Sequence, residues 1–346
     1  MYAGVKKLQL FSTDAIAKAN RESIQCRPWL RNETQKSIKL GLHKLTYQKD
    51  RQAMKSWQTV IEQIEQATGQ DVCLVKVNAM SGGDINQVYH LQGTEQSYFV
   101  KLNRADLLAM FEVEALGLQE LAGTKTLRIP EAITYGINGE YAFLVLEYVA
   151  LKSTNQATQQ QLGHQLALLH QNSQDYFGWH HDNFIGSNPQ QNTRDSHWVS
   201  FWQEQRLLAQ LELAADNGYT GKIQQLGRQL YQRIPEFFTS YQPQASLLHG
   251  DLWSGNAASD TQGQAIIYDP ACYYGDRETD IAMTELFGGF GADFYTAYNN
   301  TWPLDPGYNR RKTLYNLYHI LNHLNLFGSG YLRQAETMLQ QLVTTE

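Results

Sequence analysis

The chain has 346 residues, of which 42% are hydrophobic and 18% are charged, and its formal net charge is −6 at pH 7. This composition is typical of a folded globular protein and excludes a chain that is disordered along most of its length. The negative charge argues against nucleic acid as the main partner, because phosphate binding requires a basic surface.

The cysteines and the apolar segments indicate a cellular location. Three cysteines stand far apart, at Cys26, Cys73 and Cys272, which favours a reducing compartment over a disulfide framework. No stretch approaches the roughly 18 apolar residues of a membrane span, and the N-terminus lacks the apolar core of a signal peptide. We therefore expect a cytoplasmic protein without a membrane partner.

Charge is distributed unevenly along the chain. Residues 1–53 carry eleven Lys/Arg and four Asp/Glu, whereas the remaining residues carry seventeen and thirty. The segment has no clear hydrophobic periodicity, so we predict a poorly ordered basic extension, with Met54 as a possible alternative start. A basic arm that binds a polyanion is the other interpretation of this segment.

From Trp57 onward the pattern predicts regular structure. Helical spacing over residues 57–69 is followed by short strand-like runs, a helix over residues 106–122 and a long apolar run over residues 139–151. Long amphipathic helices follow. They are expected over residues 158–173, 197–218 and 222–241, with two or more further helices towards the C-terminus.

These elements predict an α+β fold with two lobes. A small β-rich lobe at residues 54–150 would bind a nucleotide, and a larger helical lobe at residues 151–346 would carry the catalytic and substrate-binding groups. A cleft between such lobes is where a small ligand usually binds.

The β-rich region contains three features that suit phosphoryl transfer. The segment SGGDIN at residues 81–86, with Gly82, Gly83 and Asn86, forms a hairpin whose backbone N–H groups could approach phosphate oxygens. Lys101 lies within the strand-like segment YFVKLN, and Glu114 in the following helix could hold its ammonium group by an ion pair. Each feature also has an ordinary structural explanation as a turn or an outward-facing residue.

The helical region supplies the complementary groups. In the segment LLHGDLWSGN, Asp251 would accept the proton of a substrate hydroxyl and Asn256 would bind Mg²⁺. Asp269, in the segment IIYDP, would be the second Mg²⁺ ligand, because Mg²⁺ prefers a few hard oxygen ligands together with phosphates. The order of these residues favours a phosphotransferase that uses ATP and Mg²⁺.

Other nucleotide or metal sites fit the sequence less well. Neither a Walker A motif nor a G-x-G-x-x-G segment after a strand is present. A metal hydrolase that uses His249, Asp251 and Asp269 is conceivable, but it leaves the glycine hairpin and Lys101 unexplained.

Three segments together resemble the fructosamine kinase (ketosamine-3-kinase) family. They are LLHGDLWSGN, IIYDPACYYGDRETDIAM and FGWHHDNFIGSNPQQN, and the resemblance extends from about Trp57 to the C-terminus. It implies the protein-kinase-like fold that aminoglycoside phosphotransferases share. It also implies that the segment LEYV, with Glu147, Tyr148 and Val149, is the hinge whose backbone receives adenine.

The resemblance also assigns residues on the acceptor side. Trp253 would line the sugar-amine pocket or be a core tryptophan, and Asp280 would brace the catalytic loop. Asp182 and Asn183 would contact substrate or cap a turn. Some family members carry a cysteine in the glycine hairpin, where this chain has Asp84, so the resemblance gives no support to a thiol switch there.

The implied reaction is ATP-dependent phosphorylation of the 3-hydroxyl group of a ketosamine, which leads to deglycation. The expected substrates are glycated amines, amino acids or proteins. Asp182, Asp276 and Glu278 could attract the substrate amine, although these acids could equally be structural. A kinase for an aminoglycoside or choline is the first alternative, and a non-catalytic nucleotide-binding module is the second.

Overall fold

The computed structural model describes residues 57–80 and 85–344. The predicted basic extension, residues 1–53, lies outside the described residues, and so do the predicted phosphate-binding glycines Gly82 and Gly83. These predictions therefore stay predictions.

The chain divides into two compact units. Among the described residues, the smaller unit comprises residues 57–76 together with Gln92–Gln96, and the larger unit comprises residues 77–80, 85–91 and 97–344. A helix over residues 57–68 opens the described part of the smaller unit, as its spacing predicts. The larger unit contains residues on both sides of position 150, so the expected lobe boundary there stays a prediction.

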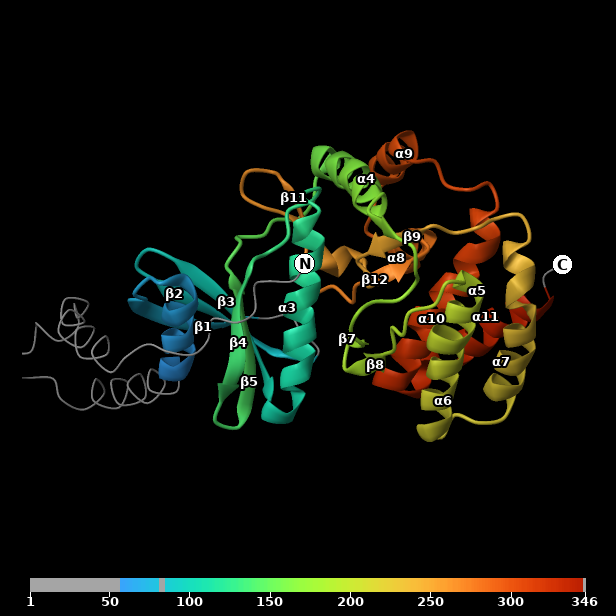
Figure 1. Ribbon diagram of the computed structural model, residues 1–346, viewed down its shortest axis with the longest axis horizontal. Helices are drawn as coiled ribbons and strands as arrows, with labels where there is room; N and C mark the ends of the chain where they lie inside the picture. Colours follow the sequence, from blue (N-terminus) through green and yellow to red (C-terminus); the bar gives the residue numbers. More distant parts are fainter. Residues whose placement is uncertain (1–56, 81–84, 345–346) are drawn as a thin grey trace, which may run out of the picture. The chain divides into compact units, whose positions relative to one another are not determined.

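Five strands form one sheet in the order β1-β2-β3-β5-β4 (Figure 1). In β5 the apolar run is buried on both faces, and β3 and β4 each pair antiparallel with it. The register places Lys101 of β3 opposite Leu144 of β5, so the lysine lies in the centre of the sheet. The strands are β1 (Leu74–Met80), β2 (Gln87–Gly93), β3 (Ser97–Arg104), β4 (Ala132–Asn138) and β5 (Tyr141–Glu147).

Helix α3 (Leu108–Gly123) follows β3 through the short 3-10 turn η2 (Ala105–Leu107) and packs against β4 and β5. The apolar stripe predicted for this helix is buried, with the exception of Leu107 in the preceding turn. Burying one such large apolar side chain contributes about 1.5–3 kcal/mol. The packing therefore fixes the helix, and with it Glu114, beside β3.

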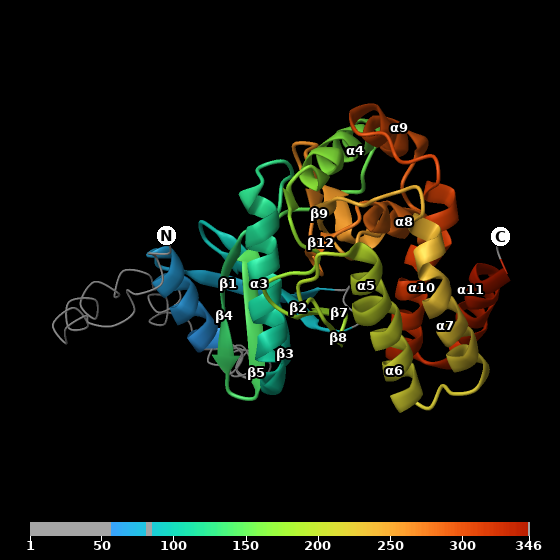
Figure 2. The same ribbon diagram turned by 45° about the vertical axis from the view of Figure 1, so that its right-hand side comes forward.

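The C-terminal region is mostly helical (Figures 1 and 2). Helices α4 and α9 lie side by side in both views, and α10 packs against α8 and α11. Asn155 caps α4 by accepting a hydrogen bond from the Thr158 N–H at 3.0 Å. The helices are α4 (Gln156–His170), α5 (Trp198–Trp202), α6 (Ala209–Asp216), α7 (Lys222–Arg233), α8 (Glu278–Leu286), α9 (Ala292–Thr301), α10 (Tyr308–Phe327) and α11 (Leu332–Thr344).

A one-turn π-helix, Gln203–Leu208, joins α5 to α6, so the helix predicted over residues 197–218 is interrupted. Two further single turns are 3-10 helices. These are η4 (Ile234–Phe238) after α7 and η6 (Ser329–Tyr331) between α10 and α11. A π-turn within a helix often marks a functional site.

Short strands hold the loops that follow them. β9 pairs with β6 and β12, β10 pairs with β11, and β7 pairs with β8. The short strand that the segment IIYDP predicts before Asp269 is confirmed as β11. The other strands of two to four residues leave no periodic signal, and the sequence did not predict them. Their bounds are β6 (Ser173–Gln174), β7 (Asn183–Ile185), β8 (Asn188–Gln190), β9 (Ala245–Leu248), β10 (Ala257–Ser259), β11 (Ala265–Ile267) and β12 (Tyr273–Gly275).

No helix in the described ranges is long and apolar enough to cross a membrane. In the same ranges, no three His, Cys, Asp or Glu side chains converge as a metal-binding group.

Candidate active site

The loop His249–Asp251 follows β9 directly and is fixed by a buried carboxylate. Asp280 accepts hydrogen bonds from the backbone N–H groups of His249 at 2.7 Å and of Gly250 at 2.9 Å. Burial opposes a charge on Asp280, but its hydrogen bonds to His170 and to these N–H groups hold its pKa below the usual range. The expected bracing role of Asp280 is confirmed.

Gly250 is required by the path of this loop. Its φ angle is +82°, which side chains rarely adopt. A Cβ atom there would lie 2.0 Å from the Ala271 carbonyl oxygen. The loop can therefore approach Ala271 this closely only with glycine at this position.

His249 is a structural residue of the loop. Its Nε2–H donates to the Tyr268 carbonyl at 2.9 Å, and its Nδ1 accepts from the Asp251 N–H at 3.2 Å. Burial lowers the pKa of the imidazole, which keeps it neutral. Because both ring nitrogens are occupied, His249 has no free nitrogen for a metal, and the metal-hydrolase alternative loses a ligand.

Asp251 lies at the end of this loop, and Asn256 orients it. The Asn256 amide donates to the Asp251 carbonyl oxygen at 2.9 Å and to its carboxylate at 3.3 Å. Burial, together with the negative charges of Asp269 and Asp280, raises the pKa of Asp251 to about 7. A carboxylate with a pKa near neutrality is well suited to accept a proton.

A second loop runs beside the first. The backbone N–H of Tyr268 donates to the Asn256 carbonyl at 3.1 Å, and that of Ala271 donates to the His249 carbonyl at 2.9 Å. Between them, Asp269 has a φ angle of 58°, a left-handed conformation that costs of order 1–3 kcal/mol outside glycine. The surrounding hydrogen bonds hold Asp269 in this strained conformation, which is common at functional sites.

Lys101 joins the sheet to these loops. Its ammonium group lies 2.6 Å from Glu114 and 2.5 Å from Asp269, so the predicted ion pair with Glu114 is confirmed. Lys101 is 4% exposed, which rules out an outward-facing strand residue. Burial alone would lower the pKa of this lysine, but the two carboxylates raise it, and the ammonium stays charged.

These groups line one cavity of about 1230 Å³ in the larger unit. Among the predicted site residues, the lining includes Asn86, Lys101, Glu114, Glu147, Val149, Asn183, Asp251, Trp253, Asn256 and Asp269. Tyr148 and Asp182 are not part of it.

Two of the three predicted hinge residues, Glu147 and Val149, line this cavity. The Glu147 carboxylate accepts hydrogen bonds from Arg128 at 2.9 Å and from the Glu131 N–H at 3.0 Å, so it is a structural brace. Tyr148 stacks on His90 at 3.8 Å between ring centroids, away from the cavity lining. Adenine binding at the hinge stays a prediction. The groups available for it are the hinge backbone and the Val149 side chain.

Asn86 and Trp253 line the cavity from segments that lie far apart in the chain. The Asn86 side-chain oxygen accepts a hydrogen bond from Asn103 at 2.8 Å, which fixes the end of the predicted glycine hairpin. Trp253 is 40% exposed and is therefore not a core tryptophan. A Cβ atom on Gly255 would lie 2.3 Å from the indole ring, so glycine allows the ring to lie over the loop.

The contacts of Asp182 and Asn183 distinguish between the two interpretations of these residues. The Asp182 carboxylate accepts the Asn192 N–H at 2.7 Å and caps the β7–β8 hairpin, outside the cavity lining. Asn183 lines the cavity, but its amide donates to the Cys272 carbonyl at 2.8 Å, and it is 5% exposed. Both contacts favour the turn-capping interpretation over a direct substrate contact.

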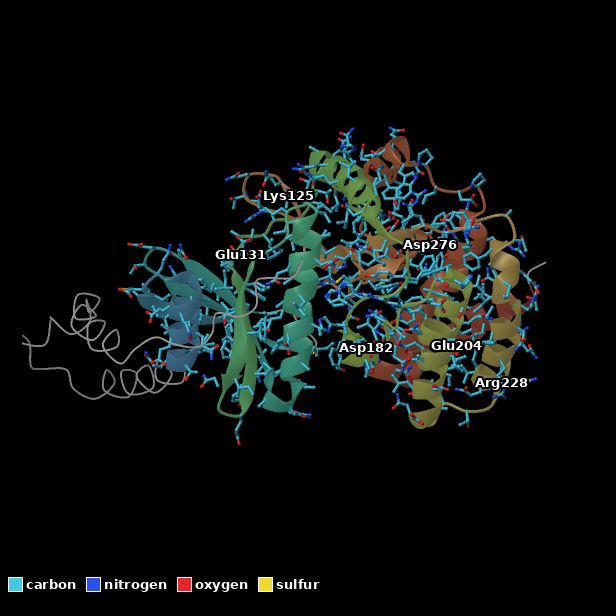
Figure 3. All side chains as sticks on the ribbon, in the orientation of Figure 1. Lys125, Glu131, Asp182, Glu204, Arg228 and Asp276 are labelled. Carbon is cyan, nitrogen blue, oxygen red and sulfur yellow. The ribbon has the colours of Figure 1, made fainter. Side chains whose placement is uncertain are left out.

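The contacts of Asp276 and Glu278 favour the structural interpretation of these two acids over the attraction of a substrate amine. Both are fully buried. Asp276 accepts hydrogen bonds from Tyr315 and Tyr241, and Glu278 forms a bidentate pair with Arg311 at 2.7 and 2.9 Å. Figure 3 labels Asp182 and Asp276, which lie well apart in the helical region.

Sequence reasoning missed Arg206, which is fully buried in the π-turn. Its guanidinium donates to the Gln191 carbonyl at 2.5 Å and to the Asn192 side chain at 2.8 Å, and it lies 4.1 Å from the centre of the Tyr273 ring. Arg206 therefore anchors the β7–β8 hairpin, which contributes Asn183 to the cavity. A lone arginine in an amphipathic helix gives no sequence signal for this role.

A five-stranded sheet with its lysine–glutamate pair, followed by a helical region that carries the loop His249–Asp251, defines a phosphotransferase of the protein-kinase-like fold. The fructosamine kinase family model matches residues 56–345, and the chain belongs to this family.

Relatives and a solved structure agree with this assignment. A probable ketoamine kinase of Synechocystis sp. is 47% identical over 82% of this chain and 96% of that protein. The chloroplastic protein-ribulosamine 3-kinase of Arabidopsis thaliana is 42% identical over 78% of this chain and 83% of that protein. A crystal structure from Haemophilus somnus, provisionally assigned as a fructosamine-3-kinase, has a TM-score of 0.76 at 28% identity, covering 83% and 97% of the two chains.

Proposed function

We propose that this protein is an ATP-dependent kinase that phosphorylates the 3-hydroxyl group of ketosamines such as fructosamine and ribulosamine adducts. Membership of the fructosamine kinase family supports the reaction. The names of the Synechocystis and Arabidopsis relatives support the substrate class. The observation that carries the proposal is the position of Asp251, which lines the same cavity as Lys101 and is oriented by the Asn256 amide. Its pKa, raised to about 7, supports the role of a proton acceptor.

Asp251 acts on the acceptor hydroxyl group. It orients the 3-hydroxyl, and its carboxylate receives the proton as the oxygen forms a bond to the γ-phosphorus of ATP. The bond between this phosphorus and the β–γ bridging oxygen breaks at the same time, and ADP leaves with the electron pair. A non-catalytic nucleotide-binding module would have no need for such a base.

Lys101 holds the phosphates of the nucleotide. Its ammonium group is kept charged and fixed by Glu114 and Asp269, so it presents positive charge where the transferred phosphoryl group develops negative charge. The adenine would lie against the backbone and side chains near Val149 and Leu146, which line the apolar part of the cavity.

The side chains of Asn256 and Asp269 are suited to bind a magnesium ion. The Asn256 amide nitrogen is used in hydrogen bonds to Asp251, which turns its side-chain oxygen outward as a free acceptor. The Asp269 side chain is 44% exposed although its partner Lys101 is buried. Asn256 and Asp269 thus supply hard oxygen ligands, and the bound ion would neutralise charge on the phosphate oxygens.

Phosphorylation at carbon three makes the adduct labile. The phosphate is a better leaving group than hydroxide, so the enaminol form of the ketosamine expels it, and water hydrolyses the resulting imine. The amine is thereby released, which amounts to deglycation of the carrier.

An ATP-turnover panel tests the proposal. We expect turnover with fructose and ribulose adducts of an amine and none with the free sugar or the free amine, since a site built for a hydroxylated substrate discriminates strongly against incomplete ones. Turnover with an aminoglycoside or choline, and with no ketosamine, would assign the protein to another substrate class.

A further inference from the structure

A group of exposed and half-buried aromatic rings lines the cavity beside Asp251. The group, called here the aromatic row, consists of Trp253, Phe287, His323, Phe327 and Tyr331. Neighbouring ring centroids are 6.5 Å apart for Trp253–Phe287, 5.0 Å for Phe287–His323 and 5.4 Å for His323–Phe327. Tyr331 lies 5.1 Å from His323.

The fold builds this row from four separate segments. Trp253 follows the base Asp251 by two residues, and Phe287 follows the end of α8. His323 and Phe327 lie four residues apart on one face of α10, which packs against α8. Tyr331 lies in the turn η6 that follows.

The exposure of these rings is unusual for this chain. Within the described residues, the tryptophan and phenylalanine side chains that are exposed are Trp253 at 40%, Phe287 at 43% and Phe327 at 49%, and all three line the cavity. Exposed aromatic rings that cluster in a cavity indicate a binding surface, because the other tryptophan and phenylalanine rings in the described chain are buried or partly buried.

The charged groups of the cavity leave the substrate amine without a free carboxylate. Glu114 and Asp269 both contact Lys101, and Glu147 contacts Arg128. Among the described residues, the remaining acidic group that lines the cavity is the catalytic base. A protonated amine in this cavity therefore has aromatic faces as its available partners, and such faces attract ammonium groups.

Substrate geometry brings the amine close to the row. In a ketosamine, three bonds of about 1.5 Å each separate carbon three from the amine nitrogen. When the 3-hydroxyl lies against Asp251, the amine must lie in the same part of the cavity, where Trp253 begins the row. The chain attached to the amine then continues over Phe287 and Phe327.

We propose that the aromatic row is the carrier subsite, whose ring faces hold the protonated amine and the alkyl chain attached to it. The enzyme then prefers ketosamines of long alkylamines, such as a lysine side chain, over those of methylamine. This inference rests on the proposed function, since it assumes a ketosamine acceptor.

His323 completes the subsite as a neutral ring. Its Nδ1–H donates to the His319 carbonyl at 2.7 Å, and burial lowers its pKa. The neighbouring His319 is also uncharged, because burial lowers its pKa to about 3. A neutral imidazole does not repel an ammonium group.

The test compares three acceptors and two variants. The acceptors are the fructose adducts of methylamine and hexylamine and the uncharged ether 1-O-hexylfructose. In Phe287→Leu and Phe327→Leu the apolar side chain is kept and the ring is removed. Tyr141→Leu is the matched control, since Tyr141 is 47% exposed but lies outside the cavity lining.

We expect the wild type to use the hexylamine adduct about tenfold better in kcat/KM than the methylamine adduct, because a few methylene groups contact the rings. Each Leu variant should lower the preference for the amine over the ether about fivefold. The KM for ATP should stay unchanged in the Leu variants at positions 287 and 327. The control Tyr141→Leu should keep the wild-type preference among the acceptors.

Three results would overturn the inference. A wild type without preference for the longer carrier would do so, as would Leu variants with an unchanged preference for the amine over the ether. An equal loss for every acceptor and for ATP would indicate general distortion of the site. Absence of turnover with both ketosamines in the wild type would instead remove the proposed function, and this inference with it.

Discussion

Replacing Asp280 by asparagine is the most informative perturbation of the catalytic loop. The two carboxylate oxygens of Asp280 separately accept the N–H groups of His249 and Gly250, and the residue is 1% exposed. An asparagine has one acceptor oxygen, so its NH₂ group must face one of these N–H donors. One hydrogen bond is lost, and the other becomes a bond between neutral groups.

The expected cost follows from these contacts. Hydrogen bonds to a charged group contribute about 1.5–3 kcal/mol each, and an unsatisfied buried donor costs about 1–3 kcal/mol. We therefore expect Asp280→Asn to lower the free energy of unfolding by about 3 kcal/mol. For a folded chain of this size, that corresponds to a fall in Tm of roughly 5 °C.

Thermal unfolding and ATP turnover measured well below Tm provide the assay. Because the loop positions Asp251, kcat should also fall at least about tenfold while the KM for ATP is unchanged. Asp293→Asn is the control, since its hydrogen bond to Gln156 is exposed and its loss should change stability by about 0.5 kcal/mol or less. A wild-type Tm and kcat in Asp280→Asn would refute the bracing role.

Four further predictions concern other parts of the site and chain. The raised pKa of Asp251 predicts that kcat/KM falls about tenfold per pH unit below about pH 7, since the protonated carboxyl cannot accept a proton; a pH profile that stays flat to pH 5 would contradict this. Asp269→Ala should abolish turnover that depends on Mg²⁺, because one amide ligand cannot hold the ion against water; activity that survives in EDTA would count against it. Arg206→Met should raise the KM for the ketosamine more than the KM for ATP, because the β7–β8 hairpin loses its anchor; equal changes would show a general loss of structure. Deletion of residues 1–53 should leave folding and turnover intact, and an insoluble truncated protein would show otherwise.

The main elements of the fold were predictable because they are long and periodic. Helix α3 and the buried strand β5 have the expected spacing, and Lys101 and Glu114 meet as their order in the chain suggests. Strand β4 was missed because Gly136 and alternating polar residues weaken its signal. The strands of two to four residues that hold the catalytic loop are too short to leave a pattern.

The acceptor side was harder to predict because contacts there depend on tertiary packing. Asp276 and Glu278 occupy a motif that suggests chemistry, but their burial against tyrosines and Arg311 makes them structural. The aromatic row was not predictable either, because Trp253 and Phe287 lie far along the chain from residues 323–331, which contain the other three members.

The position of the phosphate on the product tests the central claim most directly. A glycated lysine is incubated with ATP, Mg²⁺ and the protein, and the product is examined by mass spectrometry and by NMR. The account predicts one phosphate on carbon three of the sugar, followed by release of free lysine on standing. A phosphate on any other carbon, or a glycated lysine that stays unmodified while ATP is turned over on another acceptor, would contradict it.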